Sequence, residues 1–208
     1  MKKMNKENTK SHWENIYTEK LPQDVSWYQQ EPIISLEIIQ RFGDKNARII
    51  DVGGGESVLV DRLLKEGYSN LAVLDISGKA IEYVKKRLSD QASKIEWFEK
   101  NITEFVPLHA YDIWHDRAVF HFLTDMKSRH LYVNVLKNAV KSGSHIIIAT
   151  FAKDGPKKCS GLDIVQYDNP SIQHELGDEF ILLDSQFESH ITPAGKEQRF
   201  IYFIFQRK

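Results

Sequence analysis

The chain has 208 residues, of which 41% are hydrophobic, and its formal net charge is −1. This length and apolar content predict one domain with a sizeable buried core. The near-neutral charge gives no electrostatic basis for binding nucleic acid or an anionic membrane surface. The longest apolar runs, such as residues 146–149, have the length of a strand and are too short to span a membrane.

The N-terminal residues and the cysteine content predict a cytoplasmic protein. Residues 1–10 are polar and charged and no apolar stretch follows them, so a secretory signal is not expected. Cys159 is the one cysteine and cannot form an internal disulfide. A reduced cytosol is the usual compartment for such a chain.

The first 44 residues are expected to form a helical segment. A short helix is predicted from Ser11 to about Glu19, and Glu31-Pro32 begins a second helix with proline at its first position. Trp27 and Tyr28 lie in the polar loop between them. Because this segment precedes the first core strand, it must fold back onto the domain. Its aromatic rings could then stack over a ligand or simply pack the helices down, and both interpretations stay open.

The stretch 48–57 predicts the principal ligand site. An apolar run ends on Asp51, the glycines Gly53, Gly54 and Gly55 follow, and helical periodicity begins at Leu59. This order is typical of a strand, a tight turn and a helix. Glycine lacks a Cβ atom, so the backbone can lie against a ligand while the free N–H groups of the helix point toward it.

The spacing of these residues favours one cofactor over another. A dinucleotide site needs G-x-G-x-x-G, but Val58 occupies the third glycine position. Asp51 can receive an ammonium group, which no pyrophosphate offers. Asp75 ends the next short strand, twenty positions after Gly55, and can accept hydrogen bonds from both ribose hydroxyls. S-adenosylmethionine combines an amino-acid head with an adenosine and fits both acids.

Three further residues are candidates for the adenine. Ile76 and Ile102 are predicted to cover opposite faces of the ring, and Asn101 can pair with its edge because its amide both donates and accepts. Asn101 is equally suited to cap a helix that begins before Thr103. The sequence leaves these two roles open.

The segment 111–120 is predicted to be the fourth strand and its exit. Open α/β sheets place their chemistry at the carboxyl ends of the strands, so Asp116, Arg117, Phe120 and His121 are candidates for facing the methyl group and its acceptor. A structural hydrogen bond is the alternative for His115 and His121. Their spacing does not suit metal ligands and no carboxylates cluster with them, so no metal site is predicted.

The C-terminal residues predict how the sheet is completed. Residues 126–140 form an amphipathic helix and residues 145–151 a fifth strand. Residues 180–191 alternate in polarity like an edge strand, whereas 200–205 are apolar on both faces and belong inside the sheet. A final hairpin whose last strand is antiparallel gives seven strands.

In this order, the motifs resemble those of the class I, or Rossmann-like, S-adenosylmethionine-dependent methyltransferases. The resemblance runs from about Ile49 to the C-terminus. It is carried by Asp51-Val-Gly-Gly-Gly, Asp75, Asn101-Ile102 and the segment from Asp112 to Leu123. The chain departs from the family at Ser57, where a third glycine is frequent, and at Asn101, where aspartate is common.

Three segments resemble a narrower, bacterial branch that is similar to the mitochondrial citrate synthase lysine methyltransferase. They are His12-Trp13-Glu14-Asn15-Ile16-Tyr17, Ser26-Trp27-Tyr28-Gln29 and the segment from His115 to Leu123. In this branch the N-terminal segment covers the cofactor as a lid. The resemblance does not fix the methyl acceptor.

Together, these observations predict an α/β fold with a seven-stranded, mostly parallel Rossmann-like sheet, helices on both faces and an antiparallel C-terminal strand. One methyltransferase domain is expected over residues 1–208, divided into a helical lid (1–44) and a core (45–208). The cofactor residues are predicted to be Trp27, Tyr28, Asp51, Gly53, Gly54, Gly55, Asp75, Ile76, Asn101, Ile102 and Asp116.

The expected reaction transfers the methyl group of S-adenosylmethionine to a nucleophile on a small molecule or a protein side chain and leaves S-adenosylhomocysteine. If the acceptor is a lysine amine, which is mostly protonated at neutral pH, Asp116 or His121 would position the amine or relay its proton. Two alternatives remain: an NAD(P)-dependent oxidoreductase, against which Val58 argues, and a non-catalytic module that binds S-adenosylmethionine.

Overall fold

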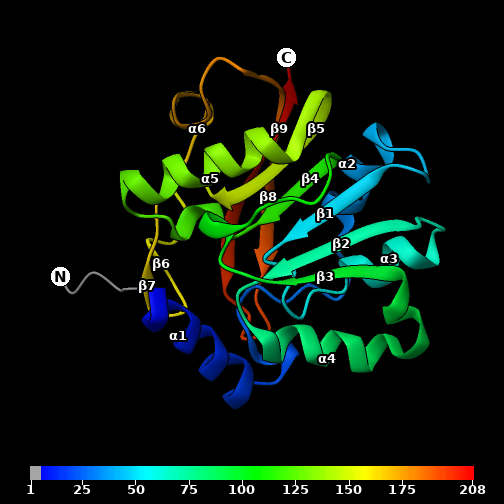
Figure 1. Ribbon diagram of the computed structural model, residues 1–208. Helices are drawn as coiled ribbons and strands as arrows, with labels where there is room; N and C mark the ends of the chain where they lie inside the picture. The colour runs from blue at the N-terminus through cyan, green and yellow to red at the C-terminus, as the bar shows by residue number, and fades with distance from the viewer. Residues whose placement is uncertain (1–5) are drawn as a thin grey trace.

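A computed structural model describes residues 6–208 of the chain (Figure 1). Its centre is a seven-stranded sheet in the order β3-β2-β1-β4-β5-β9-β8. The first five strands in sequence run parallel, β9 is antiparallel to β5, and β8 is antiparallel to β9. The predicted fold class is confirmed. The strands are β1 (Arg48–Val52), β2 (Asn70–Asp75), β3 (Ile95–Glu99), β4 (Tyr111–Arg117), β5 (Val140–Phe151), β8 (Phe180–Ile191) and β9 (Glu197–Arg207).

Helices cover both faces of the sheet because its strands are apolar on both sides. One face packs against α2 (Ile33–Phe42), α3 (Leu59–Lys65) and α4 (Gly78–Leu88). The other packs against α5 (Met126–Ala139) and α6 (Asn169–Leu176). Successive strand residues point to opposite faces. Neighbouring residues of one strand therefore enter different cores, as Ile113 and Trp114 do in β4.

The last strand confirms the prediction made from its apolar pattern. Residues 200–205 of β9 are buried on both faces, and they lie between β5 and the edge strand β8. On β8, by contrast, Phe187 and Ile191 are largely exposed. The hairpin of β8 and β9 ends next to the carboxyl ends of β1, β4 and β5, so it can contribute side chains to that edge.

Four local features differ from the sequence prediction. Strand β5 begins at Val140, five residues before the predicted start. Helix α1 (Lys6–Glu19) begins before Ser11, and the polar segment 153–168 contains a small hairpin of β6 (Lys158–Cys159) and β7 (Leu162–Asp163). Helix α6 was not predicted. Its start carries a recognisable signal, because Asp168 and Ser171 form a capping box and Pro170 lies in the first turn.

Short 3₁₀ helices complete the chain: η1 (Pro22–Asp24), η2 (Ser89–Lys94), η3 (Ile102–Glu104) and η4 (Phe120–Phe122). Within residues 6–208, none of the helices has the length and apolar character needed to cross a bilayer.

Candidate active site

The turn after β1 requires its glycines. Gly53 and Gly55 have φ angles of 69° and 45°, in the left-handed region that favours glycine. A Cβ atom on Gly53 would lie 2.0 Å from the side chain of Val119, and one on Gly54 would lie 2.9 Å from Oδ2 of Asp51. Any side chain here would therefore collide with the wall of the turn, and the backbone stays bare toward the space above it.

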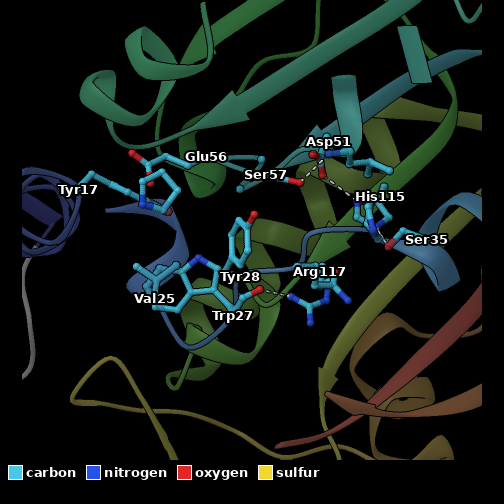
Figure 2. A pocket seen from close by; sticks show the side chains of 16 residues that line it. Tyr17, Val25, Trp27, Tyr28, Ser35, Asp51, Glu56, Ser57, His115 and Arg117 are labelled. Carbon is cyan, nitrogen blue, oxygen red and sulfur yellow. Dashed lines mark hydrogen bonds and ion pairs between the residues drawn. The ribbon is translucent and has the colours of Figure 1, made fainter. Parts of the chain in front are cut away.

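A cavity opens beside this turn, between the N-terminal segment and the carboxyl ends of β1 and β4 (Figure 2). Five of the predicted cofactor residues line it: Trp27, Tyr28, Asp51, Gly53 and Gly54. The rest of its lining consists of Tyr17, Pro22, Val25, Gln29, Pro32, Ser35, Glu56, Ser57, Leu59, His115 and Arg117.

Asp51 is held in place by two buried partners from other elements. Its Oδ1 lies 2.7 Å from Nδ1 of His115, and Nε2 of His115 lies 2.9 Å from the hydroxyl of Ser35 on α2. Because an ionised carboxylate only accepts hydrogen bonds, Nδ1 of the ring donates to Asp51, while the Ser35 hydroxyl can pair with Nε2 as a donor or an acceptor. At most 5% of each residue is exposed, yet all three line the cavity (Figure 2).

Asp75, at the end of β2, lies on the other side of the glycine turn. It accepts hydrogen bonds from the backbone N–H groups of Ser77 and Gly55. Burial raises the pKa of its carboxyl to about 7, and those two bonds oppose the rise only in part. Asp75 does not line the cavity itself. The hydroxyl of Tyr17 lies against Gly55 and interacts electrostatically with Asp75.

Glu56 adds a second acid at this end of the cavity. Only 8% of the residue is exposed, and its Oε2 has no hydrogen-bond partner among residues 6–208. Burial raises the pKa of its carboxyl to about 7, although the charge of Arg87 opposes the rise. A buried acceptor without a donor costs free energy, so this end of the cavity suits a ligand that brings hydroxyl donors or positive charge.

Helix α1 covers the Asp75 end of the site. Oε1 of Glu14 accepts from the backbone N–H of Gly78 at 2.8 Å, at the start of α4, and Lys10 pairs with Glu99 at the end of β3. The aromatic rings form one cluster that continues into the cavity: Trp13 makes edge contacts with Trp27 and Phe122.

The predicted adenine residues lie beyond the cavity. The Asn101 side chain accepts from the backbone N–H of Thr103 at 3.0 Å and caps η3, which is the alternative role that the sequence left open. Its amide nitrogen is not used in this contact and keeps its donors. Ile102 is buried in the core beneath α5, and Ile76 is half-buried after β2.

Asp116 points to the opposite face of the sheet from Asp51. Its carboxylate accepts from the backbone N–H groups of Val119 and Phe120 and, at 2.7 Å, from the hydroxyl of Tyr132 on α5. Burial raises its pKa to about 6, and these three donors oppose the rise. The residue has no exposed surface and does not line the cavity. It fixes the chain where β4 turns over Gly53.

His121 is also fully buried and does not line the cavity. Its ring lies against Phe122 and Phe151, and neither ring nitrogen has a hydrogen-bond partner in the described part of the chain. Burial and the charge of Arg117 lower its pKa to about 3. The ring is therefore neutral at physiological pH and is a weak base.

Sequence reasoning did not assign Ser35, Glu56 or Ser57 to the cofactor cavity, and it gave His115 only a structural role. Tyr17 was considered only as one of the N-terminal aromatic residues that could stack over a ligand. Two signals in the sequence and the strand pairing point to Glu56 and His115. Glu56 directly follows the glycines, and in the parallel pairing of β1 with β4 the partner of Asp51 is His115. Ser35 and Tyr17 belong to the N-terminal segment, whose docking no local pattern encodes. Among residues 6–208, no group of histidine, cysteine, aspartate or glutamate could hold a metal ion.

The site fits S-adenosylmethionine. Bare glycine backbone, an oriented carboxylate at one end, and Asp75 with the unsatisfied Glu56 carboxyl at the other suit a ligand with an ammonium group, a positive sulfur and ribose hydroxyls. Together with the strand order and the antiparallel last strand, these features define a class I, Rossmann-like S-adenosylmethionine-dependent methyltransferase.

The comparisons with known proteins lead to the same class. Residues 43–199 match the family described as "Methyltransferase domain", and the chain belongs to this family. It is 25% identical over 165 residues to EEF1A lysine methyltransferase 2 from Danio rerio, and the match covers 68% of each protein.

Solved structures share the fold at low identity. A methyltransferase from Anabaena variabilis superposes with a TM-score of 0.76 at 12% identity, over 99% of this chain and 96% of that one. The 1,6-didemethyltoxoflavin-N1-methyltransferase from Burkholderia thailandensis, with bound S-adenosylhomocysteine, superposes with a TM-score of 0.71 at 14% identity, over 96% of this chain and 87% of that one. The protein is therefore an S-adenosylmethionine-dependent enzyme that methylates an acceptor, and the oxidoreductase alternative does not apply. The resemblance to citrate synthase lysine methyltransferase stays a prediction.

Proposed function

We propose that this methyltransferase transfers the methyl group to an amine nitrogen, carried either by a lysine side chain or by a small molecule. One observation carries the placement of the cofactor: Asp51 and Asp75 flank the same glycine turn from adjacent strands. Asp51 would bind the ammonium of the amino-acid end and Asp75 the ribose hydroxyls, while Gly53, Gly54 and Gly55 leave the backbone bare between them.

The adenine would lie beyond Asp75. Ile76 would cover one face, and the unused amide nitrogen of Asn101 can donate to the ring edge while its oxygen caps η3. Ile102 supports this wall from the core. Tyr17, Trp27 and Tyr28, all in the cavity lining, would enclose the cofactor from the N-terminal side and exclude water. Residues 1–44 would thus act as a cover on a core formed by residues 45–208 within one domain.

When bound, the cofactor supplies an activated methyl group, so the protein needs to align the nucleophile and exclude water. Alignment of this kind can contribute ~7–11 kcal/mol. We propose that Asp116 and His121 act on the acceptor indirectly. Asp116 would set the position of the turn after β4, and the buried, neutral ring of His121 would support the wall behind that turn through its contacts with Phe122 and Phe151.

The acceptor class is supported by the resemblance to a lysine methyltransferase and by the acidic, aromatic surroundings of the site, which suit a cationic amine. The net charge of −1 favours neither nucleic acid nor an anionic membrane as partner. The single cysteine, buried in β6, is consistent with a cytoplasmic location.

The test is a transfer of labelled methyl groups to a lysate of the source organism. We expect a labelled protein band or a labelled small amine in which the methyl group is bonded to nitrogen. Asp75→Asn, which should not hold the cofactor, is the matched control and should give no labelled product. Label released by mild base would indicate an ester, and label on sulfur a thioether; either result would contradict an amine acceptor.

A further inference from the structure

The amino-acid end of the cofactor carries a positive ammonium and a negative carboxylate, and Asp51 can pair only with the ammonium. The α-carboxylate must enter the same cavity as the ammonium, because one carbon atom bears both groups. The cavity lining contains two acids, Asp51 and Glu56. Within residues 6–208, Arg117 is the one permanently cationic side chain in that lining.

Arg117 reaches the cavity from the end of β4, two residues after His115 and on the same face of the sheet. Figure 2 shows its guanidinium below the row of Asp51, His115 and Ser35, with the ring of Tyr28 alongside. Strand alternation places both residues toward the cavity and Asp116 away from it. A ligand that binds Asp51 through its ammonium therefore brings its carboxylate toward Arg117.

Three hydrogen bonds fix the orientation of the guanidinium. Its Nε donates to the hydroxyl of Tyr202 at 3.0 Å, one terminal nitrogen to the carbonyl of Trp27 at 3.0 Å, and the other to Glu188 at 3.4 Å. The ring of Phe200 lies 4.4 Å away and supports the planar group from one side. The side chain is only 10% exposed.

These contacts leave binding capacity unused. A guanidinium has five N–H groups, and in the described part of the chain the three bonds above account for three of them. The contact with Glu188 is long, and Glu188 also accepts from Tyr202 and Gln29. Two N–H groups on adjacent terminal nitrogens match the two oxygens of a carboxylate.

We propose that Arg117 binds the α-carboxylate of S-adenosylmethionine, so that Arg117 and Asp51 together form a clamp for the zwitterionic end of the cofactor. This inference rests on the proposed placement of the cofactor and adds a binding residue to it. The clamp is joined to the N-terminal segment, because Arg117 also holds the Trp27 carbonyl and His115 holds Ser35.

The test compares two sulfonium compounds that differ only in the carboxylate: S-adenosylmethionine and its decarboxylated analogue. Calorimetric titration of the full chain should show that removing the carboxylate weakens binding roughly tenfold to a hundredfold, the range for a hydrogen bond to a charged group. In Arg117→Gln, S-adenosylmethionine should lose that advantage, while the analogue should bind within about twofold of its wild-type affinity. Arg117→Lys should give an intermediate result.

A purely structural role for Arg117 predicts a different pattern. If Arg117 only ties Trp27 and Glu188 to the core, Arg117→Gln would weaken both compounds equally and the proposal would be wrong. Glu188→Gln provides a second measurement, because it removes the competing carboxylate and preserves the shape. It should leave the affinity for S-adenosylmethionine unchanged or raise it; a fall of tenfold or more would contradict the clamp. If the wild-type chain bound neither compound, the cofactor placement itself would fail, which is a separate result.

Discussion

Asp51 and Asp116 are both buried carboxylates at the ends of neighbouring strands, but their surroundings differ. Asp116 accepts three hydrogen bonds from its own chain, two from the backbone after β4 and one from Tyr132. Asp51 has one side-chain partner within the described residues, His115, and faces a cavity. The difference separates two uses of a buried acid: Asp116 holds a turn together, whereas Asp51 retains acceptor capacity for a ligand.

The largest effect that tests this comparison is expected for Asp116→Ala. The substitution leaves the N–H groups of Val119 and Phe120 and the Tyr132 hydroxyl without an acceptor in a fully buried region. At ~1–3 kcal/mol for each of the three unsatisfied groups, the free energy of unfolding should fall by about 3–9 kcal/mol. Urea denaturation measures this change in the free energy of unfolding. Tyr132→Phe, the control, removes one donor to Asp116 and leaves Nε1 of Trp114 without its acceptor, so it should cost about 1–3 kcal/mol. An Asp116→Ala protein as stable as the wild type would refute the structural role.

The next effect concerns pH. The pKa of Asp75 is raised from 3.8 to about 7 in the folded chain, so between these values the folded state binds more protons than the unfolded state. The stability of the cofactor-free protein that comes from protonated Asp75 is present below pH 4 and is lost as the pH rises through 7. At ~1.4 kcal/mol for each pKa unit, the upper bound of this loss is about 4 kcal/mol.

Asp75→Asn isolates this contribution because asparagine stays neutral. Thermal melts from pH 5 to pH 8 should show the variant gaining stability relative to the wild type as the pH rises. If the difference in stability between the two proteins stayed constant from pH 5 to pH 8, Asp75 would be ionised throughout this range in the cofactor-free protein.

Asp51→Asn should affect binding more than stability. Asparagine can still accept from Nδ1 of His115 through its side-chain oxygen, but it no longer offers a charge to an ammonium group. The affinity for S-adenosylhomocysteine should fall by roughly tenfold to a hundredfold, which corresponds to a loss of about 1.5–3 kcal/mol, as calorimetry can measure. A large loss of stability with unchanged affinity would reverse the comparison with Asp116.

The smallest effect is expected for Ser35→Ala. This change removes the hydrogen-bond partner of Nε2 of His115 and should lower the free energy of unfolding by about 1 kcal/mol. It should also weaken the affinity for the cofactor by only a few-fold, because His115 still donates to Asp51. Urea denaturation and calorimetry on the same sample would measure both. A loss of affinity as large as that of Asp51→Asn would mean that Ser35 itself contacts the ligand.

The fold was predictable to a large extent because its signals are local. The glycines after Asp51, the acid at the end of β2 and the apolar last strand each reflect a requirement that acts within a few residues. The pairing of the Asp168 cap with Ser171 was just as local, and α6 could have been predicted from it.

The site was less predictable because it depends on side-chain direction and on contacts distant in sequence. Asp116 and Arg117 are adjacent in sequence, yet strand alternation sends the first to the α5 core and the second to the cavity. The contact of Ser35 with His115 spans 80 positions. Asn101 had two possible roles in the sequence, and only the geometry of η3 shows which one its oxygen takes.

Helix α1 places polar groups where the ribose of the cofactor is proposed to bind. The Tyr17 hydroxyl lies on the glycine turn beside Asp75, and Glu14 accepts from the Gly78 amide close by. A ribose that binds Asp75 would have to displace these groups, so we expect the cofactor to associate more slowly than the diffusional rate. Shortening the chain to begin after Lys20 should accelerate cofactor entry and accelerate its escape still more.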